Sequence, residues 1–310
     1  MDSKVALSLD IGQPLDLAST LESGQTFRWQ RRGEWYYGVL HNDLLALRQN
    51  GPRLEVRNWS SSPEQIEAAL RDYLHLDDDL ETIYSYIDTD SRMHEAISAY
   101  RGLRILRQDP WECLVSFICS ANSNIPRISA SMVNIAENYG RPLRLDDYTN
   151  YSFPTPKRLA EVGEEALTGL KLGFRAKYVA RAAEKMAQGV VNLESLRRIP
   201  YQEAKDVLTS LAGVGDKVAD CVLLFSLDKM DACPIDRWVR RAMEDWYLNG
   251  AKLNYKDIRT WALEKWGGYA GYAQQYLFHQ RRLLGQGNAL HPRKGHVLEP
   301  GLKTVPAAIQ

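Results

Sequence analysis

The sequence predicts an α+β fold that is mostly helical, with an antiparallel β-sheet domain first and helices after it. Runs of aromatic and branched residues between turn residues fill the stretch 26–57, which is typical of antiparallel strands. From about residue 92 onward, apolar residues recur at the spacing of helices that bury one face. Hydrophobic residues make up 45% of the 310 positions and charged residues 25%, so the chain can bury a substantial core.

Turn residues divide the first stretch into separate expected strands. The strands cover 26–30, 35–40, 43–48 and 53–57, and the turns contain Gly33, His41 with Asn42, and the run Asn50, Gly51, Pro52. A helix is expected to begin near Ser62 and Pro63, because serine caps helix N-termini well and proline is favoured in the first turn.

Apolar residues at helical spacing then mark out a series of helices. They cover 110–121, 128–139, 176–188, 201–211, 217–227, 236–246, 255–266 and 270–284. The expected domains are a sheet domain at 1–97, a helical domain at 98–285 and a flexible tail at 286–310. The last segment is rich in Pro, Gly, Lys and His, as is common at loose chain ends.

Composition disfavours membrane spans and metal sites. No run of eighteen apolar residues is present, and the N-terminus lacks the basic and apolar stretches of a signal peptide, so an intracellular protein is expected. Nothing in the sequence suggests an obligate oligomer, so a monomer is expected. The cysteines lack the close spacing that zinc or iron–sulfur ligation requires, which favours free thiols and no metal. They are Cys113, Cys119, Cys221 and Cys233.

Charge is balanced over the whole chain but unevenly distributed along it. The 39 lysines and arginines offset 39 acidic residues, while basic residues recur between positions 157 and 185. A chain of zero net charge can still present one basic face to phosphate groups. Solvated helix faces explain any single one of these basic residues equally well.

A glycine-containing turn lies between two expected helices, within residues 211–220. Gly213 and Gly215 flank Val214, which lets the backbone turn tightly and approach another surface closely. The helix that follows would point free amide groups and its positive dipole end outward, and both favour phosphate. A plain turn between two helices is the alternative, and the glycines alone do not decide between them.

Several longer motifs occur in order and carry a family resemblance. They are residues 23–29 (SGQTFRW), 106–110 (LRQDP), 117–124 (FICSANSN), 172–175 (LGFR), 211–220 (LAGVGDKVAD), 232–236 (ACPID) and 269–274 (YAGYAQ). With these motifs the chain, from about residue 17 to residue 284, resembles the helix-hairpin-helix DNA glycosylases, and among them the eukaryotic-type 8-oxoguanine DNA glycosylase/lyase family. The resemblance implies a sheet domain followed by two helical subdomains with a helix-hairpin-helix motif. It also implies an intracellular, DNA-associated protein that acts on double-stranded DNA containing oxidised guanine.

The resemblance assigns catalysis to Lys217 and Asp236. Lys217 would attack C1′ of the damaged nucleotide and form a Schiff base, after which β-elimination cuts the strand. Asp236 would stabilise positive charge on the sugar. Without the resemblance, a lysine at this position is more often a phosphate contact, and the aspartate is explained as a helix N-cap. The family needs no metal or organic cofactor for this chemistry, although some hairpins of this type hold a structural monovalent cation on backbone carbonyls.

A second group of residues corresponds to the family's base pocket. Cys221 lies one helical turn after the lysine, and the extruded base would stack between Cys221 and Phe278. The Gly24 carbonyl, beside Gln25, would accept a hydrogen bond from N7–H of 8-oxoguanine, which guanine lacks. Gln274 would read the Watson–Crick edge of the base. From residue type alone, core packing and an ordinary turn explain the same positions.

A third group corresponds to residues that hold the duplex after the base is extruded. Asn122 would fill the gap, and Phe174 would act as an aromatic wedge. Arg127 and Arg175 would hold the orphan cytosine, because the planar guanidinium can satisfy its acceptors. The presence of both arginines indicates a preference for cytosine opposite the lesion, whereas an isolated arginine is more often solvated or bound to phosphate.

The chain departs from the family pattern just after the catalytic aspartate. Many relatives carry a histidine two residues after it, near phosphate, whereas this chain has Arg237 followed by Trp238. Arg237 is therefore a candidate for the phosphate contact, together with the hairpin residues Gly213, Val214 and Gly215, and the role of Trp238 is left open.

Two alternatives are weighed against this interpretation. A non-enzymatic helix-hairpin-helix DNA-binding module would need the hairpin but neither Lys217, Asp236 nor a base pocket. A monofunctional purine glycosylase of another specificity would share the fold. Alkylation enzymes of that kind usually lack the lysine, and the adenine-mismatch branch typically carries iron–sulfur cysteines, so the sequence disfavours both.

Overall fold

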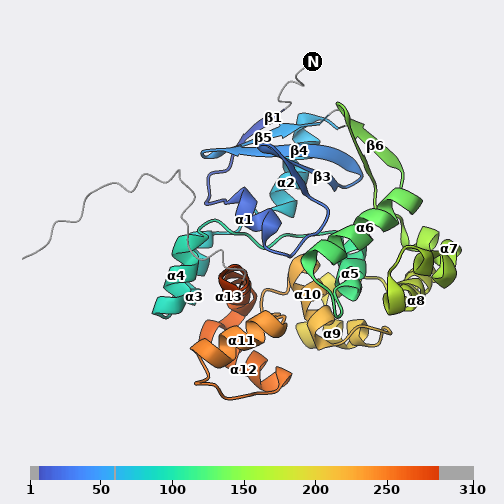
Figure 1. Ribbon diagram of the computed structural model, residues 1–310. Helices are drawn as coiled ribbons and strands as arrows, with labels where there is room; N and C mark the ends of the chain where they lie inside the picture. The colour runs from blue at the N-terminus through green and yellow to red at the C-terminus, as the bar shows by residue number, and fades with distance from the viewer. Residues whose placement is uncertain (1–6, 59–60, 286–310) are drawn as a thin grey trace, which may run out of the picture.

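The computed structural model places the antiparallel sheet at one end of the molecule and most of the helices at the other (Figure 1). The structure describes residues 7–58 and 61–285, and the expected tail at 286–310 lies outside the described residues. The expected α+β fold, with the sheet first and helices after it, is confirmed. Among the described residues, no helix is long and apolar enough to cross a membrane.

The N-terminal sheet is antiparallel, with the strand order β1-β5-β4-β3-β2. Its strands are β1 (Leu7–Asp10), β2 (Gln30–Arg32), β3 (Trp35–Leu40), β4 (Asp43–Asn50) and β5 (Arg53–Arg57). The strands expected at 35–40 and 53–57 are confirmed, and the one expected at 43–48 continues to Asn50. Strand β1, which pairs with β5 at the edge of the sheet, was not expected.

The strand expected at 26–30 is wrong, because Phe27 and Arg28 reach the helical part and only Gln30 joins the sheet. Phe27 packs against Phe117, with ring centroids 5.6 Å apart. The buried Arg28 forms a two-pronged ion pair with Glu112, with Nε–Oε1 at 2.6 Å and Nη2–Oε2 at 3.0 Å. Side chains committed to the helices cannot alternate between two sheet faces, so strand β2 begins only at Gln30.

Each face of the sheet is covered by another element. The covering elements are α1 (Leu17–Glu22) and α2 (Pro63–Tyr73) on one face, and the hairpin of β6 (Pro142–Leu145) and β7 (Tyr148–Tyr151) on the other. Leu47 and Val56 pack with the two helices, whereas Trp35 and Ala46 pack with Leu145 of the hairpin. Alternate residues of the strands therefore serve two separate apolar clusters.

The rest of the structure is helical. The helices are α3 (Leu80–Ile87), α4 (Ser91–Ala99), α5 (Pro110–Cys119), α6 (Ile125–Tyr139), α7 (Pro156–Gly169), α8 (Ala176–Ala187), α9 (Tyr201–Thr209), α10 (Asp216–Ser226), α11 (Arg237–Trp246), α12 (Tyr255–Trp266) and α13 (Ala270–Gly285). Short 3-10 turns lie at Gly173–Arg175, Glu194–Arg198 and Gly267–Tyr269. The helices expected after residue 92 are confirmed to within three residues at each end, and α2 begins at Pro63 with the expected Ser62 as its N-cap. Helices α3 and α7 and hairpin β6–β7 were not expected.

The helical part has its own core, in which α10 is central. All residues of α10 from Val218 to Ser226 are buried, while its first residue, Asp216, is exposed. The side chains that α3 and α4 contribute, from Leu80 to Ile97, belong to this core and not to that of the sheet. Burial along its length therefore fixes α10 and leaves its N-terminus at the surface.

Candidate active site

The expected helix-hairpin-helix is formed by α9, the turn at 211–215 and α10. Gly213 has φ +84°, and a Cβ at this position would lie 2.7 Å from Cδ2 of Tyr178, so only glycine fits this approach. Gly215 is the N-cap of α10, and no side chain caps the helix there. The Val214 side chain is buried and anchors the turn, while both glycines are exposed. The uncapped amides of α10 suit an anion such as phosphate.

Lys217 lies in the first turn of α10 and reaches the end of α5. Its Nζ donates a hydrogen bond to Oγ of Ser120 at 3.0 Å. The same ammonium lies 4.8 Å from the centroid of the Phe117 ring. The side chain is partly buried, so Phe117 of α5 and the C-cap residue Ser120 hold the lysine while it remains accessible.

Asp236 is the N-cap of α11. Its Oδ1 accepts hydrogen bonds from the backbone amides of Trp238 at 2.8 Å and Val239 at 2.9 Å. Since Oδ2 takes part in neither bond, one oxygen anchors the carboxylate and the other can face a second group. The N-cap role and a role in catalysis are therefore compatible.

The buried thiol of Cys221 lies close to both predicted catalytic residues. Burial raises the pKa of Cys221 to about 12, the charge and hydrogen bond of Lys217 oppose this rise, and the charge of Asp236 adds to it. The thiol therefore stays protonated at neutral pH. The structure brings Lys217, Asp236 and Cys221 into one site, and the roles that the sequence assigns to them stay predictions.

The Gly24 turn packs against helix α13. Gly24 has φ +81°, and a Cβ there would lie 3.3 Å from Cε1 of Phe278 and 2.9 Å from Cδ1 of Ile125. The ring of Phe278 therefore packs directly on the glycine. Gln274 is only 3% exposed, and its Oε1 has no hydrogen-bond partner among the described residues. A buried acceptor without a partner is costly, which is typical of a group that waits for a ligand.

Gln25 supports the Gly24 turn from behind and does not offer its amide to a ligand. Its Nε2 donates to the carbonyls of Thr20 at 3.0 Å and Arg104 at 2.8 Å, and its Oε1 accepts from the amide of Leu106 at 2.9 Å. The side chain is fully buried. We therefore place Gln25 behind the pocket wall, where it fixes the turn.

Two residues of α13 that sequence reasoning missed also hold this turn. Gln275 donates from Nε2 to the carbonyl of Ser23 at 3.3 Å, and Arg282 donates from Nη2 to the carbonyl of Glu22 at 2.8 Å. Both lie on α13 near Phe278, at helical spacing of three and four residues. In the sequence, this helical spacing indicates only that Gln275 and Arg282 lie near Phe278 on the helix. It does not show that they bond the turn around Gly24.

The residues predicted to hold the duplex lie on the loop after α5, the first turn of α6 and the 3-10 turn at Gly173–Arg175. Arg175 donates from Nε to the carbonyl of Ala121 at 2.9 Å and from Nη2 to that of Asn122 at 3.1 Å. Its guanidinium lies 4.5 Å from the ring centroid of Phe174, which is 48% exposed. Asn122 has φ +50° and is exposed, as is Arg127 at the start of α6. Asn122, Arg127 and Phe174 thus lie exposed along one edge, and the half-buried Arg175 joins the Phe174 turn to the Asn122 loop.

Arg237 and Trp238 begin helix α11. Arg237 is exposed, and its guanidinium lies 5.4 Å from the ring centroid of Trp238. Trp238 packs on the end of α13, since a Cβ at Gly285 would lie 2.6 Å from its Cζ3. The exposed Arg237 is therefore better placed than Trp238 for a phosphate contact. Trp238 instead packs α11 against α13.

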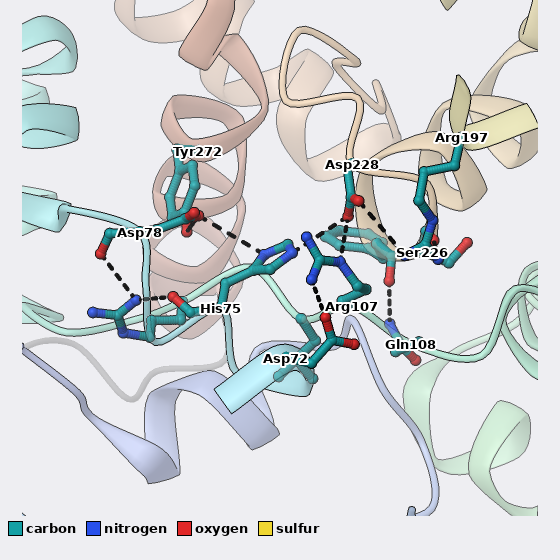
Figure 2. A network of polar contacts seen from close by, with 12 residues as sticks. Asp72, His75, Asp78, Arg107, Gln108, Arg197, Ser226, Asp228 and Tyr272 are labelled. Atoms are coloured by element: carbon teal, nitrogen blue, oxygen red, sulfur yellow. Dashed lines mark hydrogen bonds and ion pairs between the residues drawn. The ribbon is translucent and has the colours of Figure 1, made fainter. Parts of the chain in front are cut away.

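A charged network holds the other end of α10 (Figure 2). The carboxylate of Asp228 lies 3.3 Å from Nε2 of His75, 2.8 Å from Nε of Arg107 and 3.6 Å from Nη1 of Arg197. Burial would raise the pKa of Asp228, but hydrogen bonds from His75 and Arg107 and the charges of both arginines hold it well below its usual range. His75 follows α2, so the network ties the lysine-bearing helix to the sheet domain.

The hairpin, the lysine after it and the aspartate that caps the next helix together define a DNA glycosylase of the helix-hairpin-helix class. Residues 115–267 match the family described as HhH-GPD superfamily base excision DNA repair protein. Residues 8–114 match the family described as 8-oxoguanine DNA glycosylase, N-terminal domain. The chain belongs to the 8-oxoguanine DNA glycosylase family.

Individual relatives cover nearly the same length. An N-glycosylase/DNA lyase of Arabidopsis thaliana is 39% identical to this chain over 280 residues, which cover 85% of this chain and 76% of the relative. An N-glycosylase/DNA lyase of Saccharomyces cerevisiae is 30% identical, with coverage of 85% and 82%. The solved 8-oxoguanine glycosylase/lyase of Clostridium acetobutylicum, bound to DNA with cytosine opposite 8-oxoguanine, is 32% identical with a TM-score of 0.84, covering 92% of this chain and 100% of that chain.

Proposed function

We propose that the protein is a bifunctional DNA glycosylase and lyase that excises 8-oxoguanine from double-stranded DNA in base excision repair. The observation that carries this proposal is the common site of Lys217, Asp236 and Cys221 beside an uncapped hairpin helix. A non-enzymatic binding module has no use for such a group. The plant and yeast relatives named as N-glycosylase/DNA lyases support the same activity.

The proposed reaction begins at Lys217. Its unprotonated Nζ attacks C1′ of the flipped nucleotide, the C1′–N9 bond breaks, and the purine leaves with the bonding electrons and takes up a proton. Asp236 stabilises the positive charge that develops on the sugar. Nζ then loses its proton and the sugar ring opens to give the imine. Removal of a proton from C2′ finally expels the 3′ phosphate by β-elimination, which cuts the strand.

Selectivity for the lesion is assigned to Gly24 and Gln274. 8-Oxoguanine carries a hydrogen on N7 where guanine carries a lone pair, so a carbonyl at Gly24 would bond the first and repel the second. The unpartnered Oε1 of Gln274 supports a bond to the Watson–Crick edge of the base. Phe278, which packs on Gly24, supplies a flat surface for stacking.

We also infer a preference for cytosine opposite the lesion. Arg127 and Arg175 lie along the edge that carries Asn122 and Phe174. The orphan cytosine would lie at this edge after the damaged base is extruded. A guanidinium can donate two hydrogen bonds to the acceptors of cytosine. In the clostridial relative the DNA also carries cytosine opposite 8-oxoguanine, which supports this inference.

The proposed chemistry needs neither a metal nor an organic cofactor, because Lys217 supplies the nucleophile. Activity is therefore expected to persist in EDTA. A monovalent cation on the carbonyls of the hairpin at 211–215 would act structurally and take no part in the reaction.

Borohydride trapping tests the proposal directly. We expect a covalent protein–DNA adduct with a duplex carrying 8-oxoguanine opposite cytosine, and its loss in Lys217→Gln. Lys229→Gln is the matched control, since Lys229 lies beyond the other end of α10 and bonds the carbonyl of Arg197 at 2.8 Å.

Other outcomes of this experiment would point elsewhere. Base release without a trapped adduct would make Lys217 a binding residue of a monofunctional glycosylase. Tight binding without any base release would favour a DNA-binding module.

A further inference from the structure

Asp220 is a buried carboxylate that the proposed reaction does not use. It lies on α10 three residues after Lys217 and is 0% exposed. Its Oδ1 accepts a hydrogen bond from the Tyr201 hydroxyl at 2.6 Å, and its Oδ2 accepts one from the Tyr255 hydroxyl at 2.6 Å. Burying a carboxylate is unfavourable compared with burying an apolar side chain, so its presence calls for a specific explanation.

Tyr255 connects this carboxylate to the segment that ends at Asp236. Its hydroxyl donates to Asp220 and accepts a hydrogen bond from the backbone amide of Ile235 at 3.3 Å. Ile235 directly precedes Asp236 and is buried. The bonds from Asp220 through Tyr255 to Ile235 therefore join the helix that carries the lysine to the residue next to the catalytic aspartate.

The opposite side of Asp220 is held by helix α9. Lys205 Nζ lies 3.4 Å from Oδ1 of Asp220 and 3.1 Å from the hydroxyl of Tyr201. It also lies 3.0 Å from Asp216, the first residue of α10. Burial raises the pKa of Asp220, while the charge of Lys205 and the two tyrosine hydroxyls oppose that rise. The carboxylate is thus fixed from two sides and forms a rigid base for Tyr255.

We propose that Asp220 and Tyr255 are positioning residues that set the placement of Asp236 relative to Lys217 during base excision. Neither residue touches the substrate. They act through Ile235, whose amide fixes the start of α11. The proposal rests on the proposed function, since it concerns the spacing of that catalytic pair. Small displacements of reacting groups lower rates strongly, so the loss of one hydroxyl is expected to have a measurable effect.

Tyr255→Phe tests the proposal, because it removes the hydroxyl and keeps the ring. Tyr247→Phe is the matched control: its hydroxyl also bonds a carboxylate, Oδ1 of Asp90 at 3.2 Å, on a different part of the helical domain. For Tyr255→Phe we expect the single-turnover rate of 8-oxoguanine excision to fall about tenfold with saturating enzyme. The Kd for a duplex containing a tetrahydrofuran abasic-site analogue should stay within about twofold. Tyr247→Phe should change neither quantity.

A second variant distinguishes positioning from general support of the fold. Asp220→Asn should also slow excision at unchanged Kd, and the double variant with Tyr255→Phe should be no slower than the slower single variant, because both act through one chain of bonds. A wild-type rate in Tyr255→Phe, or a parallel loss of rate, affinity and thermal stability, would overturn the proposal and leave the proposed function standing. Absence of excision by the wild type would overturn both.

Discussion

The backbone conformation of Gly213 predicts that a larger residue at this position destabilises the hairpin. With φ at +84° and Tyr178 directly beneath it, an alanine would be strained and would overlap the ring. We expect Gly213→Ala to lower the free energy of unfolding by about 2 kcal/mol or more and to weaken DNA binding. Gly215→Ala is the matched control, since its φ is −100° and a Cβ there would meet nothing within 4 Å. Urea denaturation measures the free energy of unfolding of the two variants. Equal free energies for Gly213→Ala and Gly215→Ala would contradict this explanation.

Individual site residues were predictable from the sequence only where a motif contains them. Lys217, Asp236 and Cys221 lie in two nearby motifs, and the structure brings them together, although their roles stay predictions. Ser120 lies in the motif at 117–124, but its contact with Lys217, 97 residues later in the chain, was not predicted. Tyr178 lies under Gly213 in the same way, from another helix. No spacing rule connects such partners, because tertiary packing alone places them.

The anchor at the end of α10 predicts how stability depends on pH. Asp228 is held by His75, Arg107 and Arg197, and its pKa lies below the ordinary value of 3.8. A depressed carboxyl pKa stabilises the fold fully above the unfolded pKa, and this contribution is lost as pH falls through the folded pKa. We expect Asp228→Asn to lower the free energy of unfolding at pH 7 by about 1–3 kcal/mol. The difference from wild type should shrink between about pH 5 and pH 3.

Chemical denaturation at a series of pH values measures this difference. Asp77→Asn is a suitable control, because the Asp77 side chain is 88% exposed and its ion pair with Arg71 is long, at 4.0 Å. If the difference in the free energy of unfolding between wild type and Asp228→Asn stays constant as the pH falls, Asp228 stabilises the fold through its packing and not through its charge.

Whole elements were predictable where local pattern and tertiary packing agree. Strands β3 and β5 alternate between two covered faces, so their pattern is visible in the sequence. The stretch 26–30 also contains aromatic residues, but Phe27 packs in the helical core while Trp29 packs with the sheet cluster, so the stretch cannot alternate like a strand. Helix α7 was missed because Gly163, at φ +74°, breaks it into two short pieces and interrupts the helical pattern. Residue type predicts local conformation, whereas the partner surface decides the element.

The molecule as a whole combines zero net charge with a surface that must bind phosphate. The 39 basic and 39 acidic residues cancel, so long-range attraction to DNA is expected to be weak. Many charges are also paired internally, as around Asp228 and between Arg28 and Glu112. Binding must then depend on a small number of local contacts, which are the uncapped amides of the hairpin and exposed cations such as Arg237.

This view predicts a moderate dependence of DNA affinity on salt. Each cation that neutralises a phosphate contributes about 0.9 to the slope of log K against log salt, and uncharged amides contribute little. With about four such cations, affinity should fall about a hundredfold between 50 and 200 mM salt. Arg237→Gln should reduce the slope by about 1. Arg53→Gln, which changes an exposed arginine of the sheet domain, should leave it unchanged. Equilibrium binding at several salt concentrations decides this, and an unaltered slope in Arg237→Gln would exclude that residue from the phosphate contacts.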